Sequence, residues 1–184
     1  MRPMTAESTA SHPVSSRVSR VEPGTVTAER AALEEWLDYH RATLETKCAG
    51  LDEAQLRTVS VPPSDLNLLG LVRHMAEVER GWFRKVLAGE DVTWIFATAE
   101  DYDRDIHVTE EDTWEEAYTA WQGEIARART LAADRGLDDI GVGEHRSGDT
   151  FNLRWIYLHM IEEYARHNGH ADLIRERIDG ATGD

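Results

Sequence analysis

Apolar residues recur at three- and four-residue steps in four stretches of the chain, which is the period of an amphipathic helix that buries one face. These stretches are residues 28–48, 64–88, 113–135 and 152–178. No stretch alternates apolar and polar residues for long enough to predict a strand. The pattern therefore predicts an all-α protein, most simply a four-helix bundle.

The starts of three predicted helices carry residues whose side-chain oxygens accept hydrogen bonds from free backbone N–H groups. These N-caps are Thr27, Ser64 and Thr113, and Glu116 completes a capping box with Thr113. The helix ends are followed by glycines, namely Gly50, Gly89, Gly136 and Gly180. Caps and glycines thus agree with the apolar period on where the helices begin and end.

Two connections have features of their own. Residues 51–56 are expected to add a short helical turn, and Pro62-Pro63 keeps the following linker non-helical. Residues 91–109 form a long connection with several aromatic residues, which is expected to pack as a lid or shape a pocket. Its length allows the helices on either side of it to lie parallel.

Residues 1–24 are rich in Ser, Thr, Pro and Arg and lack apolar periodicity. This composition favours a disordered tail ahead of one bundle domain at residues 25–184. The stretch also lacks the continuous apolar region of a secretory signal. We further hypothesise that translation starts at Val26, which peptides from residues 1–24 of the native protein would refute.

The composition limits which binding partners and which cellular compartment we expect for this protein. Asp and Glu total 35 against 20 Lys and Arg, so the formal net charge is -15. Such acidity argues against nucleic acid or an anionic membrane as partner. The single cysteine, Cys48, excludes an intramolecular disulfide and is expected to be an inert buried thiol, which suits a reducing cytoplasm. No apolar run approaches the ~20 residues that span a bilayer.

Candidate chemistry gathers on one flank of the last predicted helix, beside the apolar stripe centred on Met160. The residues on this flank are His159, Glu163, His167 and His170. Residues four apart on a helix point the same way and lie about 6 Å apart, so two of them can reach one ion. His74, beside the apolar stripe of the second helix, is the best partner from another helix. Two imidazoles and a carboxylate inside a bundle predict a site for a divalent metal, which would offset the cost of burying the carboxylate.

Plainer interpretations of the same residues stay open at this point. Glu163 and His167 also fit a hydrogen bond or ion pair on a helix surface. His40 fits a satisfied core histidine, and His159 a residue at the rim of a site. Four tryptophans are expected in the core, and three arginines are expected on the outer face of the second helix. They are Trp36, Trp82, Trp121 and Trp155, and Arg73, Arg80 and Arg84.

Two segments around these histidines resemble motifs of the DinB-like superfamily. One is residues 64–80 with Trp82-Phe83, and the other is residues 152–155 with residues 159–172. The chain from about residue 27 to residue 180 is most similar to the mini-circle-type branch, a family of domains of unknown function. Mycothiol-dependent maleylpyruvate isomerases are relatives of that branch. The resemblance implies an up-down-down-up bundle that holds a divalent metal with three side chains.

By this resemblance His74 and His167 are the first and last metal ligands. The middle ligand, four residues before the last, is histidine in most DinB-like proteins and Glu163 in this chain. Glutamate also occurs there in the isomerase-like relatives. His170 is the reserve ligand if Glu163 does not bind. Zinc is the expected metal, with nickel, iron and manganese as alternatives.

The resemblance also implies a chemistry. The metal would bind the sulfur of a low-molecular-weight thiol such as mycothiol, lower its pKa and present a thiolate to a small-molecule electrophile. The expected function is a metal-dependent S-transferase or thiol-assisted isomerase. The alternatives are a non-catalytic metal-binding or stress-response bundle, with a homodimer as its assembly, and a metal-assisted hydrolase.

Overall fold

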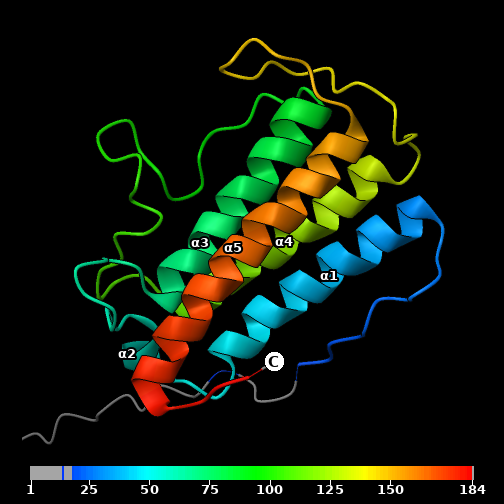
Figure 1. Cartoon of the computed structure of the whole chain (residues 1–184). Coiled ribbons are helices and arrows are strands. Elements are labelled where there is room, and N and C mark those ends of the chain that lie inside the picture. Colours follow the sequence, from blue (N-terminus) through cyan, green and yellow to red (C-terminus); the bar gives the residue numbers. More distant parts are fainter. Residues whose placement is uncertain (1–13, 15–17, 184) are drawn as a thin grey trace, which may run out of the picture.

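The chain forms four long helices that pack as a bundle, which confirms the predicted all-α fold (Figure 1). The computed structural model describes residue 14 and residues 18–183. The helices are α1 (Glu29–Cys48), a short α2 (Glu53–Leu56), α3 (Leu68–Glu79), α4 (Trp114–Ala132) and α5 (Leu153–Asp179). α3 continues directly into a π-helix, η1 (Arg80–Leu87). Among the described residues the one β-feature is an isolated bridge between Ile140 and Asn152.

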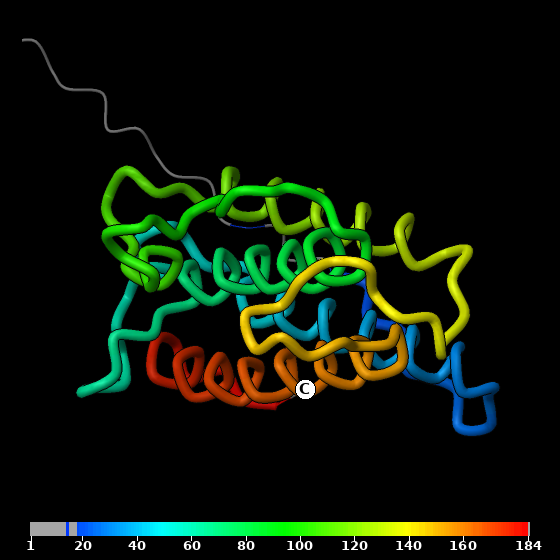
Figure 2. Tube along the Cα trace, turned by 90° about the horizontal axis from the view of Figure 1, so that it is seen from above, coloured from blue at the N-terminus to red at the C-terminus, as the bar shows by residue number. Residues whose placement is uncertain are grey.

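The helices run up-down-down-up, because α1 and α5 point one way and α3 and α4 the other (Figures 1 and 2). α1 packs mainly on α5, and α3 mainly on α4. The parallel arrangement of α3 and α4 requires a connection that returns along the length of the bundle, and residues 88–113 provide it. None of the described helices is long and apolar enough to cross a bilayer.

Two of the three predicted caps are wrong. α1 begins after Ala28 without a side-chain cap, so Thr27 is not the N-cap of this helix. α3 begins later than predicted, and the Asn67 side chain caps it by accepting the N–H of Gly70 at 2.8 Å. Ser64 lies in the preceding turn and accepts the N–H of Leu66 instead. Thr113 caps α4 as predicted, but among the described residues no return bond from Glu116 to the Thr113 N–H completes the predicted capping box.

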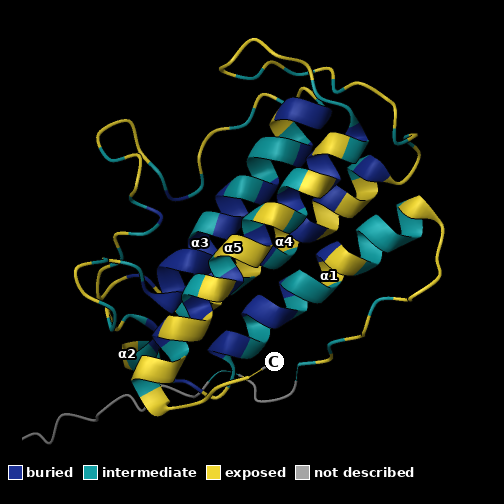
Figure 3. Ribbon diagram, viewed as in Figure 1, coloured by how far each residue is buried: buried dark blue, intermediate teal, exposed yellow. Residues whose placement is uncertain are grey.

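The centre of the bundle is apolar and contributed by all four long helices (Figure 3). It includes the residues Leu37, Leu44, Leu71, Met75, Trp121, Ile125, Ile156, Met160 and Ile174. Of the tryptophans expected there, Trp121 is fully buried, whereas Trp36 and Trp155 are 46% and 41% exposed. Trp36 lies at the edge of the apolar stripe of α1, and Trp155 lies on the far side of α5 from the buried Met160, so packing leaves both partly exposed.

A buried polar network crosses this apolar centre, and each long helix contributes one member. Arg41 of α1 donates two hydrogen bonds of 2.8 Å to the carboxylate of Glu79 on α3. Tyr164 of α5 donates to Glu79 Oε1 at 2.8 Å, and Trp121 of α4 donates to the Tyr164 oxygen at 2.7 Å. Such directional bonds in a low-dielectric interior fix the rotation of the helices about their axes.

The described residues ahead of α1 have no regular secondary structure, and several of them contact the bundle. Val14 exchanges backbone hydrogen bonds with Gly50 and Leu51, and the N–H of Gly24 donates to Glu35 at 2.8 Å. Most of the predicted tail at residues 1–24 lies outside the described residues. The boundary of the domain at residue 25 and the start at Val26 therefore stay predictions.

Candidate metal centre

α3 and α5 bring together the three side chains that the sequence singled out. His74, Glu163 and His167 each offer a donor atom, and these three atoms lie within 4.8 Å of one another. His167 Nε2 is 3.4 Å from Glu163 Oε2, and the ring centres of His74 and His167 are 4.8 Å apart. Two neutral imidazoles and a carboxylate form a donor set that suits Zn²⁺ and other divalent transition metals. The residues present thus fit the metal that the resemblance implies.

Local helix geometry explains why Glu163 and His167 lie close together. Glu163 and His167 are one turn apart on α5, beside the buried Met160 and Tyr164, and their donor atoms lie near that of His74 on α3. His74 is brought opposite them because its neighbour Met75 is buried in the core. All three side chains of the triad are partly buried, which limits competition from water without closing the site.

Both imidazoles of the triad have a partner on Nδ1. His74 Nδ1 is 2.8 Å from Asp105 Oδ2, and His167 Nδ1 is 3.4 Å from His170 Nδ1. In each case Nε2 is the nitrogen left for the centre of the site. His170 therefore lies beside His167 and outside the group of three that meets His74. The sequence did not predict Asp105, since nothing in its spacing links the 91–109 connection to a residue on α3.

The electrostatics of the site keep His167 neutral. Burial is the largest cause, and the neighbouring His74, His170 and Arg166 add to it, so the pKa of His167 is lowered from 6.5 to about 4. A neutral imidazole is the form that binds a metal ion. His167 is thus ready to act as a ligand at neutral pH without first losing a proton.

A second group of donors shares Glu163 with the triad. His159, Glu162 and Glu163 also offer atoms within 4.8 Å of one another. Arg166, however, forms ion pairs with both Glu162 and Glu163, and its guanidinium places a positive charge on that side. His159 lies at the rim, where its ring stacks on Trp155 with 4.9 Å between ring centres. The triad with His74 is therefore the better candidate for a metal.

His40 and Cys48 stand apart from this site. His40 lies on α1, where its backbone oxygen accepts a 3.0 Å hydrogen bond from Asn168. Cys48 is fully buried, and burial raises the pKa of its thiol. A thiol that is buried and protonated is a poor nucleophile. Neither residue belongs to a group of candidate metal donors among the described residues.

Arg73 is not on the outer face of α3, contrary to the sequence interpretation. Its side chain is buried under the connection between η1 and α4, where it forms an ion pair with Asp112 and donates to the Arg104 carbonyl at 3.1 Å. Arg80 and Arg84 lie nearer the surface and pair with Glu124 of α4. The connection covers the face of α3 that would otherwise be solvated.

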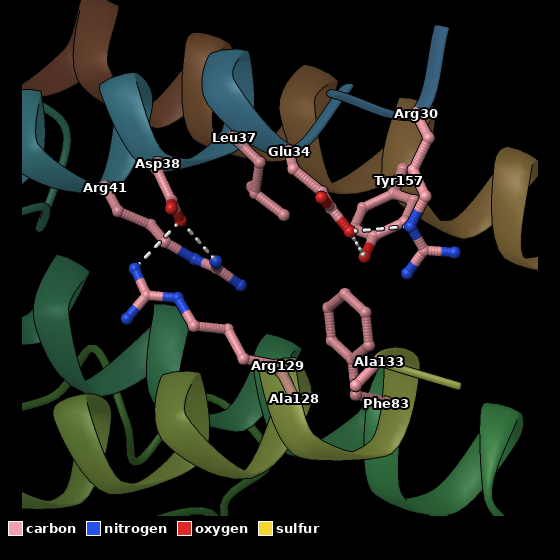
Figure 4. Close-up of a pocket in the computed structure, with 10 residues that line it drawn as sticks. All are labelled: Arg30, Glu34, Leu37, Asp38, Arg41, Phe83, Ala128, Arg129, Ala133 and Tyr157. Carbon is pink, nitrogen blue, oxygen red and sulfur yellow. Dashed lines mark hydrogen bonds and ion pairs between the residues drawn. The ribbon is translucent and has the colours of Figure 1, made fainter. Parts of the chain in front are cut away.

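A separate cavity of about 360 Å³ lies between α1, η1, α4 and α5 (Figure 4). Asp38 lies between Arg41 and Arg129 at one end, and Glu34 accepts hydrogen bonds from Arg30 and Tyr157 at the other. None of the triad residues lines it. Because its charged groups already pair with one another, the cavity does not compete with the triad as a catalytic centre.

Comparison with known protein families adds one finding. Residues 32–180 match the model of a family described as mycothiol-S-transferase. The matched residues include the three members of the triad and nearly all of the bundle. No curated protein matches the chain.

Proposed function

The chain belongs to the mycothiol-S-transferase family, and on that premise we propose that it is a metal-dependent enzyme that transfers mycothiol to a small electrophile. The metal ligands in this proposal are His74, Glu163 and His167. The observation that carries it is the convergence of their three donor atoms within 4.8 Å of one another. Three protein ligands leave a coordination position for a substrate, as in catalytic zinc sites.

Each residue of the site has its own role in this proposal. His74 and His167 would bind the metal as neutral ligands, and Glu163 would contribute one negative charge. A divalent metal held there supplies a Lewis acid that lowers the pKa of a coordinated thiol. Asp105 and His170 hold the imidazole rings through Nδ1 and so orient Nε2. Cys48 takes no part, because it is fully buried.

Several finer features belong to the same proposal. Zinc is the metal we expect, and nickel, iron and manganese are the alternatives. The reaction is either transfer to the electrophile or a thiol-assisted isomerisation. Placement in the mini-circle-type branch rests on residues 64–80 and 159–172, and action in the cytoplasm rests on the single, buried cysteine.

The test begins with metal content. Elemental analysis of the purified protein should find close to one divalent metal per chain, lost in His74→Ala and in His167→Ala. His107→Ala is the matched control, because His107 is an exposed histidine that pairs with Asp101 and belongs to neither group of candidate donors. A protein that holds no metal at neutral pH would refute the proposal.

The second step is transfer itself. Zinc-loaded protein is incubated with mycothiol and an aryl halide, and mass spectrometry follows the thioether product against a protein-free control. We expect acceleration with mycothiol, a smaller effect with glutathione or bacillithiol, and none with His167→Ala. Metal binding without transfer to any electrophile would favour the non-catalytic bundle, and hydrolysis without thiol would favour the hydrolase.

A further inference from the structure

We propose that Asp105 is a positioning residue for the metal centre and that residues 104–106, here called the positioning arm, are docked on α3 to present it. The inference rests on the proposed metal-binding function. It concerns a residue outside the two segments that resemble DinB-like motifs. This residue lies on a connection that is remote in sequence from the triad. Its basis is a set of contacts between the arm and the first turns of α3.

The carboxylate of Asp105 is buried and both of its oxygens are engaged. Oδ2 is 2.8 Å from His74 Nδ1, and Oδ1 accepts the backbone N–H of Ile106 at 2.9 Å. The Asp105 side chain is 7% exposed, whereas the His74 ring that it contacts is 28% exposed. The arm therefore holds the carboxylate in one orientation, behind the imidazole and away from solvent.

Two residues six positions apart, at the cap and in the first half of α3, hold the arm in place. Asn67, the cap of α3, donates from Nδ2 to the Ile106 carbonyl at 3.2 Å. Arg73 donates to the Arg104 carbonyl at 3.1 Å. These bonds lie on either side of Asp105 in the arm, so both neighbours of Asp105 are bound to the helix that carries His74.

Gly70 lies between these two attachments and allows the arm to come close. A Cβ at this position would lie 2.8 Å from the Ile106 carbonyl oxygen and 3.0 Å from Ile106 Cα. Both are backbone atoms, so a side chain could be accommodated only by moving the arm outward. Gly70 is in an ordinary helical position, and its role is the close approach of Ile106.

The rest of the connection is also fastened to α3, further along the helix. Glu77 accepts the backbone N–H groups of residues 95–97 through Oε1, at 2.7, 2.6 and 3.0 Å. The Arg73 guanidinium lies over the Phe96 ring at 4.4 Å. The arm is thus one part of a segment attached along α3, and its position does not depend on a single bond.

The chemical consequence is a fixed tautomer. A carboxylate can only accept a hydrogen bond, so His74 carries its proton on Nδ1 and keeps the Nε2 lone pair for the metal. The partner carboxylate also holds the orientation of the imidazole ring, and removing such a partner typically costs 10–100-fold in metal affinity. Asp105 therefore acts on the metal through His74 without touching it.

Zinc affinity and the tautomer of His74 test the assignment independently. In a competition titration, Asp105→Ala should raise the zinc Kd about 10–100-fold. Asp91→Ala is the matched control, because Asp91 is an exposed aspartate on the same connection outside the positioning arm, and the zinc Kd of this variant should not change. Asp105→Asn keeps the side-chain volume and should raise the Kd by a smaller factor.

The metal-free protein gives the second measurement. Imidazole ¹⁵N shifts at neutral pH should show His74 protonated on Nδ1 in the wild type and mainly on Nε2 in Asp105→Ala. Gly70→Ala should shift both the tautomer and the Kd in the same direction as Asp105→Ala. Gly123→Ala on α4, where a Cβ meets nothing within 4 Å, should leave both unchanged.

The outcomes separate this inference from the proposed function. An unchanged Kd and an unchanged tautomer in Asp105→Ala would overturn the role of Asp105 while leaving the metal centre in place. If the wild type binds no divalent metal, the proposed function fails, and the ¹⁵N measurement still decides whether Asp105 fixes His74. If Asp105→Ala does not fold, an unchanged Kd in Asp105→Asn overturns the proposal, and a raised Kd supports it.

Discussion

The phenolic hydroxyl of Tyr164 donates a 2.8 Å hydrogen bond to Oε1 of Glu79 in the centre of the bundle. Tyr164 directly follows Glu163 on α5, and Glu79 lies at the end of α3, the helix that carries His74. The bond therefore links the two helices of the candidate metal centre on the side facing the core. It holds the rotation of α5, and with it the direction in which Glu163 and His167 point.

Removing the Tyr164 hydroxyl should destabilise the fold. Tyr164→Phe leaves the Trp121 N–H without its buried acceptor and takes one donor from Glu79, at a cost of about 1–3 kcal/mol in the free energy of unfolding. Urea denaturation measures this difference. Tyr102→Phe, which changes a tyrosine that is 70% exposed, is the control and should be neutral. Equal stability of the two variants would show that the Tyr164 hydroxyl adds nothing to the stability of the fold.

The Arg41–Glu79 pair should be more sensitive to losing one partner than to losing both. Glu79→Leu leaves the buried Arg41 guanidinium with only the half-exposed Asp38 as its carboxylate partner, and losing one partner of a buried pair typically costs about 3–5 kcal/mol. In Arg41→Leu combined with Glu79→Leu the buried charge is gone, and the double variant should be more stable than Glu79→Leu alone. A double variant that is less stable than Glu79→Leu would contradict this account. The same urea series provides the measurement.

His170 and His167 should differ sharply in their effect on metal binding. His167→Ala removes a donor atom of the triad, and metal should be lost on dialysis. His170→Ala removes only the partner of His167 Nδ1, so the metal should stay with an affinity lowered about tenfold or more. Isothermal titration with zinc distinguishes the two. Complete loss of binding in His170→Ala would instead make His170 a ligand.

Asp112 should make stability depend on pH in the acid range. Burial alone would raise the pKa of Asp112, but the N–H of Thr109 and the guanidinium groups of Arg73 and Arg104 bring it down to about 2. The folded pKa lies below the unfolded value of about 3.9. The carboxylate therefore stabilises the fold above pH ~4, and this contribution disappears as the pH falls toward 2.

Asp112→Asn tests that dependence, since the amide does not titrate. Near neutral pH the variant should be about 2 kcal/mol less stable than the wild type. Below pH ~4 the wild type loses the charge-dependent part of its stability, so the difference should shrink. Urea denaturation from pH 7 to pH 3 follows it. A difference that stays constant over this range would disprove the charge-based explanation.

The thiol of Cys48 should be unreactive toward alkylating reagents in the native protein. Its side chain is fully buried, and burial raises the pKa of the thiol, so little thiolate is available to react. Iodoacetamide should label Cys48 only after unfolding, as mass spectrometry will show. Cys48→Ala should keep the rate of thiol transfer, and loss of transfer in a folded Cys48→Ala protein would place this thiol in the reaction.

The sequence determined the features that depend on neighbours along the chain. The apolar period predicted the four long helices, because it decides which side of each helix can be buried. The i, i+4 spacing of Glu163 and His167 placed both side chains on one flank of α5, because helix geometry fixes their relation locally. Thr113 was also predictable as a cap, since its bond to the N–H of Glu116 stays within one turn.

The tertiary structure decided which of these surfaces meet. His74 faces His167 because α3 packs beside α5, and the path of the connection places Asp105 behind His74. Arg73 is buried by that same connection, which its position on the helix alone did not reveal. Such contacts join residues far apart in the chain, so they depend on how whole elements pack together. Helical periodicity determines which residues share a face, but it does not determine what covers that face.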